Sequence, residues 1–327
     1  MKFLVTGVAG MIGSHLTDLL LEKQFQVVGV DNFSVGTNNN IKDHLKNENF
    51  KFFEFDLLDD SPLLEDLVKD SDIVIHLAAV KKVSESQNAF NTLNVNVEAT
   101  KIILNFCNKF KKRLVFASTS DVYGISEDIP FKEGGNTLLG PSTAKRWAYA
   151  VSKLYCEHLC LSYFKDFNQN VVILRYFGGF SEKSSLTWSG GHIAVFIEKL
   201  MKDELIQIHG DGTQTRSMGH GSDLAYGTML AALSDISGEI INIGNDEEMS
   251  VIDTLWLIGK LMNIPKTKIK LEFLSEQEVF GDYKDIQRRV PDLSKAKKLL
   301  NYEPKVKLTD AIQMVISELE KNEKKIR

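Results

Sequence analysis

Two side chains with acid–base potential, Tyr149 and Lys153, stand four residues apart in a stretch with a helical pattern. On a helix, this spacing places both side chains on one face. A phenol has a pKa of about 10, which is too high for a base at neutral pH. A neighbouring ammonium favours the phenolate and would lower that pKa. The pair therefore predicts a tyrosine that removes a proton from a substrate, supported by the lysine.

A tyrosine–lysine pair alone is often structural, so a site needs further groups. The run Ala117-Ser118-Thr119-Ser120-Asp121-Val122-Tyr123-Gly124 follows an apolar segment that we expect to be a strand. It supplies a hydroxyl, on Thr119, that could hold the reacting oxygen. Asp121 adds a carboxylate, although an aspartate in a solvated turn is an equally ordinary interpretation. The candidate catalytic residues are Thr119, Asp121, Tyr149 and Lys153.

A glycine-rich run, Gly7-Val8-Ala9-Gly10-Met11-Ile12-Gly13, connects the first predicted strand to the first predicted helix. Glycines let the backbone turn sharply and approach a pyrophosphate, which then sits on the free N–H groups of the helix N-terminus. Asp31 ends the second predicted strand, where a carboxylate would accept hydrogen bonds from an adenosine ribose and repel a 2′-phosphate. The loop and Asp31 therefore predict NAD, rather than NADP, as the cofactor. Its positive nicotinamide ring would also favour a phenolate at Tyr149.

The elements that must position these residues alternate between strands and helices over the first half of the chain. The predicted strands are residues 2–6, 26–30, 50–55, 72–77, 113–118 and 170–175. The predicted helices are residues 11–23, 88–110 and 145–167. Such alternation is typical of a parallel sheet covered by helices. The predicted fold class is α/β, with a Rossmann-type doubly wound parallel sheet.

After residue 175 the elements become shorter. Residues 181–191 are rich in Ser and Gly and are expected to form a loop. The remaining expectations are helices at 192–201, 251–262 and 308–321, strands at 206–208 and 239–243, and a turn at 209–212. We expect a nucleotide-binding domain in residues 1–175, joined by part of residues 221–250. Residues 176–327 are expected to form a smaller, partly interleaved α/β substrate domain.

Composition argues against several classes of function. The formal net charge of −5 does not suit a general nucleic-acid binder. No apolar run approaches the roughly 18–20 residues needed to span a bilayer, and the first residues lack the layout of a signal peptide. The three cysteines, Cys107, Cys156 and Cys160, have no ligand cluster, which favours buried reduced thiols over disulfides or zinc. We expect a cytoplasmic protein with no metal and with neither a membrane nor a nucleic-acid partner.

The spacing Gly-x-x-Gly-x-x-Gly, with Asp31-Asn32 after the second strand, resembles the extended branch of the short-chain dehydrogenase/reductase superfamily. With Thr119, Tyr149 and Lys153 added, the chain is similar nearly end to end to the nucleotide-sugar epimerase/dehydratase family. The resemblance implies NAD as the cofactor and a nucleotide-diphosphate sugar as the substrate. The cofactor contacts that it implies are Gly7, Gly10, Met11, Ile12, Gly13, Asp31, Asn32, Asp56, Leu57, Leu77, Ala78, Ala79, Lys81, Asn96, Tyr149 and Lys153.

On the substrate side, two arginines match family positions that hold the diphosphate. Arg216 ends the run Gly210-Asp211-Gly212-Thr213-Gln214-Thr215-Arg216, and Arg289 lies in a segment near the C-terminus. A guanidinium suits phosphate because it donates two hydrogen bonds in one plane. The substrate contacts that the resemblance implies are Lys81, Thr119, Gly178, Arg216 and Arg289.

Two departures from the family pattern lie on the substrate side and bear on the identity of the sugar. Gly178 stands where the family usually has an asparagine that meets the substrate. Gly221-Ser222-Asp223 replaces the family's Val-x-Asp. The glycine loop keeps the family pattern, so the expectation of NAD is unaffected.

Three reactions begin with oxidation at C4 of the sugar: 4-epimerisation, 4,6-dehydration, and decarboxylation of a uronic acid. In this family, dehydratases follow the threonine with Asp-Glu, and decarboxylases follow it with Ser-Glu. Ser120-Asp121 lacks the full acid–base pair and is one methylene shorter than Ser-Glu. Because a misplacement of about 1 Å can cost about a hundredfold in rate, we expect a 4-epimerase. A 4,6-dehydratase and a UDP-uronic acid decarboxylase are the alternatives.

A non-catalytic NAD-binding sensor is a more remote interpretation, and the retained Thr119, Tyr149 and Lys153 oppose it. The resemblance also implies a homodimer, in which the long helices at 88–110 and 145–167 pair with their symmetry mates. Apolar faces on these helices, with Ile102, Ile103 and Phe106 as examples, fit such pairing but would equally fit a monomer's core.

Overall fold

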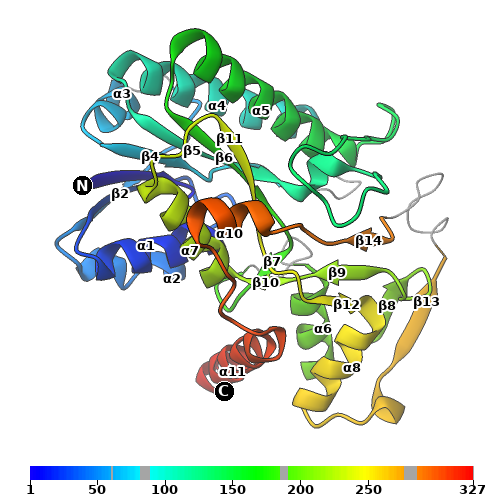
Figure 1. Cartoon of the computed structure of the whole chain (residues 1–327). Helices are drawn as coiled ribbons and strands as arrows, with labels where there is room; N and C mark the ends of the chain where they lie inside the picture. The colour runs from blue at the N-terminus through cyan, green and yellow to red at the C-terminus, as the bar shows by residue number, and fades with distance from the viewer. Residues whose placement is uncertain (60–61, 82–88, 185–190, 276–285, 327) are drawn as a thin grey trace.

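A seven-stranded parallel sheet forms the centre of the computed structural model, which describes residues 1–59, 62–81, 89–184, 191–275 and 286–326 (Figure 1). The strand order is β11-β6-β5-β4-β1-β2-β3. These strands are β1 (Lys2–Thr6), β2 (Gln26–Asp31), β3 (Phe50–Glu54), β4 (Ile73–His76), β5 (Arg113–Thr119), β6 (Val171–Tyr176) and β11 (Glu239–Ile243). The chain order reverses between β1 and β4, so a crevice opens at their carboxyl ends. The predicted Rossmann-type α/β fold is confirmed.

Helices cover both faces of this sheet (Figure 1). One face carries α3 (Pro62–Lys69), α4 (Ala89–Phe110) and α5 (Trp147–Phe167), and the other carries α1 (Met11–Glu22), α7 (Gly221–Leu233) and α10 (Ser294–Leu300). Within β1, Leu4 packs into the core on the α4–α5 face, while Phe3 and Val5 pack into the core on the α1–α7 face. Burial on both faces explains why these strands are continuous apolar runs rather than alternating ones.

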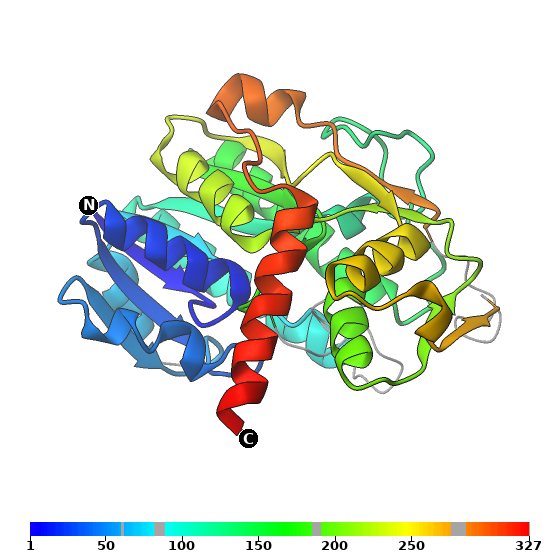
Figure 2. The same cartoon turned by 90° about the horizontal axis from the view of Figure 1, so that it is seen from below.

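A second, smaller region lies beside the carboxyl ends of the sheet, around its own apolar core. It contains α6 (His192–Met201) and α8 (Val251–Leu261). Its strands are β7 (Gly179–Phe180), β8 (Ile206–His209), β9 (Thr215–Ser217), β10 (Gly219–His220), β12 (Glu248–Ser250), β13 (Leu271–Leu274) and β14 (Arg288–Arg289). The last helix, α11 (Leu308–Ile326), runs across the molecule between this region and the sheet (Figure 2).

The elements predicted from sequence occur at the expected places, with ends that differ by a few residues. The predicted helix at 145–167 begins at Trp147. Position 88, the predicted start of α4, lies outside the described residues, as do positions 185–190 of the predicted loop. The sequence analysis missed α2 (Asn38–Ile41), α3, α7 and α10. It also missed β7, β9, β10, β12, β13 and β14, because two to four strand residues carry little readable alternation. No helix in the described part of the chain is both long and apolar enough to cross a membrane.

Two missed helices have identifiable causes. The start of α7, Gly221-Ser222-Asp223, has the composition of a loop, but the His220 side chain caps it by accepting from the Ser222 N–H. The residues that form α10, 294–300, were expected to belong to the second domain. In the structure, Ala296 and Leu300 of α10 pack into the same core as α1 and α7, because the chain returns to the sheet after β14.

A buried ion pair connects α5 to the sheet below the cavity described in the next subsection. Arg175 on β6 donates to both carboxylate oxygens of Glu157 on α5, from Nε at 2.9 Å and from Nη2 at 2.7 Å. The two side chains are only 4% and 2% exposed. The Ser118 hydroxyl on β5 donates to the same carboxylate. The carboxylate therefore joins two neighbouring strands and a helix at one point.

We expect Arg175→Leu to lower the free energy of unfolding by about 3–5 kcal/mol, because it leaves the Glu157 carboxylate buried without its cation. Denaturant titration of the purified variant measures this change. Adding Glu157→Leu should recover much of the loss, since it removes the unpaired charge.

The control is Lys46→Leu, which breaks an ion pair of 2.7 Å whose side chains are 77% and 73% exposed. This change should leave stability nearly unaltered because solvent screens such pairs. Equal effects of Arg175→Leu and Lys46→Leu would contradict the weight we give to the buried pair.

Candidate active site

A cavity of about 890 Å³ opens at the carboxyl ends of the central strands. Its wall includes Gly7 after β1, Asp31 at the end of β2, Thr119 at the end of β5, and Tyr149 and Lys153 on α5. This is the crevice where the strand order reverses, the usual place for ligands in open α/β sheets. Residues from the glycine loop and from the predicted catalytic group therefore face one space.

The glycine loop approaches its neighbours too closely for side chains. Gly7 has φ of +72°, and a Cβ at this position would lie 2.8 Å from the Ala78 nitrogen. A Cβ on Gly13 would lie 2.3 Å from the Gly7 carbonyl oxygen. Gly10, Met11, Ile12 and Gly13 all line the cavity at the start of α1. This bare backbone at a helix N-terminus fits a dinucleotide pyrophosphate.

The Asp31 carboxylate shapes the loop as well as facing the cavity. Its Oδ2 accepts from the Ala9 N–H and its Oδ1 from the Phe33 N–H, both at 2.9 Å. Burial raises the pKa of Asp31, and the backbone donors oppose this shift. Each oxygen retains acceptor capacity toward the cavity. Beside it, Asn32 Nδ2 donates to Asp56 Oδ2 at 2.9 Å, and both residues line the cavity with Leu57.

The segment after β4 forms another part of the wall, through Leu77, Ala78, Ala79 and Lys81. Asn96 on α4 is absent from the described lining and lies behind this segment. Its Oδ1 accepts from the Val80 N–H at 2.8 Å, and its Nδ2 donates to the Val80 carbonyl and to Ser152 Oγ. Asn96 therefore positions the wall and holds it against α5.

Thr119, Tyr149 and Lys153 lie together at the end of β5. The hydroxyls of Thr119 and Tyr149 share a hydrogen bond. Lys153 Nζ donates to the Ala117 carbonyl at 2.8 Å and is 2% exposed. Burial lowers the pKa of Lys153 to about 8. The hydroxyl, phenol and ammonium come from two adjacent elements.

The expectation that the lysine lowers the pKa of Tyr149 needs correction for the protein alone. Burial raises the pKa of Tyr149 well above its usual value, and the Asp121 carboxylate raises it further. Only the hydrogen bond with Thr119 acts in the opposite direction. Burial also lowers the pKa of Lys153, so its ammonium loses its charge before the buried phenol ionises.

Asp121 lies among cations near these residues. Arg289 Nη1 donates to Asp121 Oδ1 at 2.6 Å, which joins β14 to the end of β5. Burial opposes ionisation of Asp121, but Arg289, Arg146 and Lys81 together hold its pKa below the usual range. Asp121 and Arg289 both line the cavity. The sequence analysis did not foresee this ion pair between residues 168 positions apart.

The two predicted phosphate-binding arginines are neighbours on adjacent strands. Arg216 on β9 and Arg289 on β14 are direct partners in a parallel pair, so both side chains leave the same face of that small sheet. Among the described residues, none accepts from the buried Nε of Arg289. Arg216 is absent from the described lining of the cavity, and its Nη1 donates to the Thr215 carbonyl.

Gly178 lines the cavity, and its surroundings explain the missing asparagine. A Cβ at this position would lie 2.4 Å from Met218 Sδ and 3.0 Å from the Ser217 carbonyl oxygen. Met218 therefore occupies the space that a larger residue at 178 would need. The glycine at position 178, where the family usually has an asparagine, therefore fits the packing of Met218, which lies between β9 and β10.

Part of the lining was missed from sequence. The additional residues come from three places, the segment after β2, the segment after β7 and the last helix: Asn39, Asn40, Lys42, Lys183, Ser184, Glu318 and Leu319. The first group follows a strand end, which is a signal that could have been used. The approach of α11 to the cavity has no local signal in the sequence.

Comparisons with known proteins agree with this geometry. The model of the "NAD dependent epimerase/dehydratase family" matches residues 3–244. The chain is 32% identical to the UDP-N-acetyl-alpha-D-glucosaminuronate decarboxylase of Bacillus cytotoxicus, over 96% of each chain. It is 33% identical to the UDP-glucuronic acid decarboxylase 1 of Danio rerio, over 96% of this chain and 72% of the relative.

A solved structure is similar over nearly the whole length. The UDP-glucuronic acid 4-epimerase from Bacillus cereus, in complex with UDP-glucuronic acid and NAD, superposes with a TM-score of 0.87. It is 32% identical in sequence, and the match covers 98% of this chain and 100% of that chain.

We expect Asp31→Asn to reduce the preference for NAD over NADP by about tenfold. Removing the negative charge removes the repulsion of a 2′-phosphate, and about 1.4 kcal/mol corresponds to that factor. Fluorescence titrations with both dinucleotides measure the ratio of dissociation constants.

Glu54→Gln is the matched control, because Glu54 pairs with Asp31 in the β2–β3 register but is absent from the described cavity wall. It should leave the ratio unchanged. An equally small effect of both substitutions would remove Asp31 from cofactor selection.

Proposed function

Since the chain belongs to the NAD dependent epimerase/dehydratase family, we propose that it is a 4-epimerase of a UDP-activated uronic acid. The cofactor of this family is NAD, which when bound takes a hydride from C4 of the sugar and later returns it. The substrate class draws on two relatives and one solved structure, whose names specify UDP-glucuronic acid or UDP-N-acetylglucosaminuronate. These proteins perform decarboxylation or 4-epimerisation, so the choice between the two depends on this chain's own residues.

In the proposed reaction, Tyr149 takes the proton of the C4 hydroxyl, and Thr119 holds the same oxygen. Their shared hydrogen bond supports this assignment, because a substrate oxygen bound between two such hydroxyls can donate to one and accept from the other. Lys153, fixed by the Ala117 carbonyl, contributes positive charge on the same helix face. The product of the first step is a 4-keto sugar, and turning it before the hydride returns inverts C4.

The ion pair between Asp121 and Arg289 is the observation that carries the choice of epimerisation. Dehydration needs a second group that donates a proton to the departing hydroxyl. Arg289, Arg146 and Lys81 outweigh the effect of burial and hold the pKa of Asp121 low, so this carboxyl is ionised and cannot donate. Bound to Arg289, it is also a poor base. Asp121 therefore acts by orienting Arg289.

The surplus of positive charge near Asp121 also bears on the fate of a uronate. Three cations surround one carboxylate, so a second carboxylate, from the substrate, would be attracted there. Loss of carbon dioxide moves negative charge from the substrate carboxylate toward the C4 oxygen. Cations beside the carboxylate stabilise the substrate before this charge moves, and they therefore oppose decarboxylation. The charge distribution therefore supports retention of the carboxylate.

Decarboxylation is the second candidate, favoured by the names of two similar relatives. It shares the first step at C4 and would need the same Thr119, Tyr149 and Lys153. The two reactions differ in whether the product keeps its carboxylate.

Incubation of the purified protein and NAD with UDP-glucuronic acid or UDP-N-acetylglucosaminuronate should give a product of unchanged mass and inverted C4. Mass spectrometry and proton NMR of the sugar measure this outcome. Loss of carbon dioxide would establish the decarboxylase, and loss of water the dehydratase.

In the same assay, Tyr149→Phe should lower turnover by about a hundredfold or more while NAD still binds, because it removes one proton-transfer group and little volume. Tyr155→Phe is the control on the same helix, since Tyr155 is 50% exposed and absent from the described cavity lining. Near-normal turnover by Tyr149→Phe would exclude the proposed mechanism.

We further propose that Arg216 and Arg289 bind the substrate diphosphate. Arg216→Ala should weaken UDP binding by about ten- to a hundredfold, the equivalent of a charge-assisted contact of about 1.5–3 kcal/mol. NAD affinity should hardly change. Arg288→Ala is the control, because Arg288, the residue before Arg289 on β14, is exposed and pairs with Glu248. Calorimetric titration with UDP separates the variants, and unchanged affinity would assign Arg216 to structure.

We also propose a homodimer through α4 and α5. Of the residues first considered for this contact, Ile103 is fully buried in the chain's own core, and Ile102 and Phe106 pack against that core. The outer face of α5 still exposes Val151 and Tyr155, at 44% and 50%. Sedimentation should show a dimer that Tyr155→Glu weakens. A monomer at every concentration would refute the dimer.

A further inference from the structure

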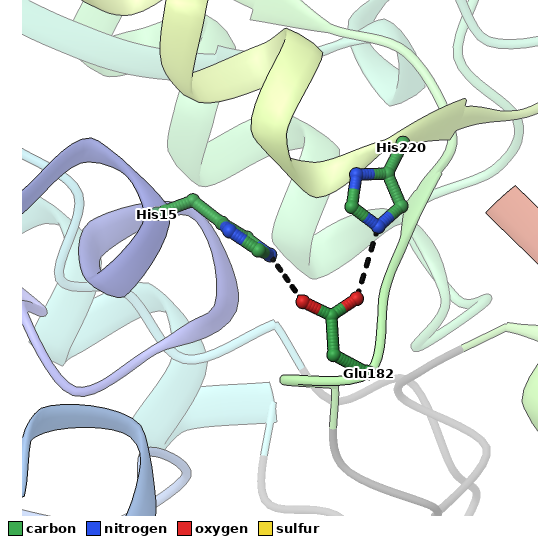
Figure 3. A group of neighbouring side chains, drawn as sticks. All are labelled: His15, Glu182 and His220. Atoms are coloured by element: carbon green, nitrogen blue, oxygen red, sulfur yellow. Dashed lines mark hydrogen bonds and ion pairs between the residues drawn. The ribbon is translucent and has the colours of Figure 1, made fainter. Parts of the chain in front are cut away.

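Two histidines and a glutamate, drawn together from distant parts of the chain, form a compact cluster beside the glycine loop (Figure 3). His15 belongs to α1, Glu182 follows β7, and His220 belongs to β10. The side chains of His15 and His220 are 8% and 4% exposed, and that of Glu182 is 26% exposed. Glu182 also lines the cavity, but none of the roles proposed above uses the cluster.

The distances within the cluster match those between ligands of one metal ion. His15 Nε2 lies 3.6 Å from Glu182 Oε1, and His220 Nε2 lies 3.0 Å from Glu182 Oε2. One ligand atom from each residue falls within 4.8 Å of the others. Zinc ligands at about 2.0–2.2 Å in tetrahedral geometry stand about 3.3–3.6 Å apart. Small side-chain adjustments would therefore suffice to bring all three onto one ion.

The outer nitrogen of His220 also has a suitable neighbour. With a metal bound, an Nδ1–H of His220 would donate to Ser222 Oγ, 2.7 Å away, in place of the capping bond that Nδ1 accepts from the Ser222 N–H, and Nε2 would keep a free lone pair. His15 Nδ1 lies 3.9 Å from the Asp18 carboxylate, beyond hydrogen-bond reach, and its Nε2 lies 3.1 Å from Ser181 Oγ, a contact that a metal would displace. Metal-binding histidines usually have such a hydroxyl, carbonyl or carboxylate behind them, which orients the ring.

The surrounding charge permits a cation. The nearest ammonium, Lys183 Nζ, is 2.5 Å from the Asp18 carboxylate, which also contacts His44. Away from the histidines, Glu182 lines a surface pocket of about 420 Å³ together with Asp310, Glu318 and Lys321 of α11, so carboxylates outnumber the one lysine there. These carboxylates provide an acidic entry path from solvent.

We propose that His15, Glu182 and His220 bind a divalent transition-metal ion of the zinc class, with a water molecule as the fourth ligand. Two imidazoles and one carboxylate suit zinc among the ions commonly available, whereas magnesium prefers oxygen ligands alone. The ion joins α1, the segment after β7 and β10. Since Lys183 and Ser184 of that segment line the cavity, the metal holds this part of the wall against the cofactor-binding helix.

The competing interpretation is a hydrogen-bonded triad without metal. In that arrangement His220 Nδ1 accepts from the Ser222 N–H at 3.3 Å, and the Nε2–H donates to Glu182. The two arrangements differ in the tautomer of His220 and in whether added zinc binds.

The test uses the full chain, freed of metal with a chelator and then titrated with Zn²⁺ by calorimetry, with metal content measured by mass spectrometry. We expect one Zn²⁺ per chain and a raised melting temperature, with no binding of Mg²⁺ in its place. Glu182→Gln and His220→Gln should each weaken Zn²⁺ binding by about a hundredfold or more, since changing even a group that only hydrogen-bonds to a metal ligand costs about 10- to 100-fold.

His158→Gln is the matched control, because His158 is an exposed histidine on α5 and should leave zinc affinity unchanged. Substitution with Co²⁺ should give a spectrum without a thiolate band, which separates this site from the three buried cysteines. The melting temperature of each metal-free variant reports whether it is folded. Failure of the wild type to bind Zn²⁺, or equal binding by Glu182→Gln, His220→Gln and wild type, would overturn the proposal in favour of the triad.

Discussion

The buried pair of Glu157 and Arg175 is the interaction on which the geometry of the candidate active site depends. Glu157 lies one helical turn after Lys153 on α5, and the same carboxylate accepts from Ser118, the residue before Thr119. A single carboxylate therefore sets the position of the helix that carries the phenol and the ammonium relative to the strand that carries the hydroxyl. Because the pair is buried away from water, separating its two charges would be costly. The pair therefore holds α5 in a fixed position against β6.

Electrostatics then determines which chemistry this frame can support. Burial raises the pKa of Tyr149, so the site disfavours a free phenolate in the protein alone. At the cavity wall, Asp121 is held ionised by a surplus of cations, which removes it as a proton donor and leaves positive charge for an acidic substrate. Thr119, at the end of β5, and Tyr149 and Lys153, on α5, can thus begin several reactions. In the proposed function, the groups around Asp121 favour epimerisation among them.

The cofactor side and the second region meet around α1. Its N-terminus presents bare backbone to the cavity because Gly7 and Gly13 pack against neighbouring backbone without room for a Cβ. One turn further along, His15 contacts Glu182 and lies near His220, which come from the segments that lead into the second region. The His15–Glu182–His220 cluster therefore joins α1 to the segment that carries Lys183 and Ser184, which are part of the cavity wall.

The sequence by itself determined the doubly wound sheet, the glycine loop with Asp31, and the group of Thr119, Tyr149 and Lys153. The glycine loop lies within one strand–loop–helix unit, and Tyr149 and Lys153 lie within one helix, so spacing along the chain translates directly into geometry. Asp31 and Thr119 each end a strand of the same parallel sheet, which places them at its carboxyl edge. Only the tertiary structure decided that Arg289 pairs with Asp121, that Met218 fills the space beside Gly178, and that His15, Glu182 and His220 meet. These contacts join residues from separate elements, and their distances depend on how the second region packs on the sheet, which no local spacing records.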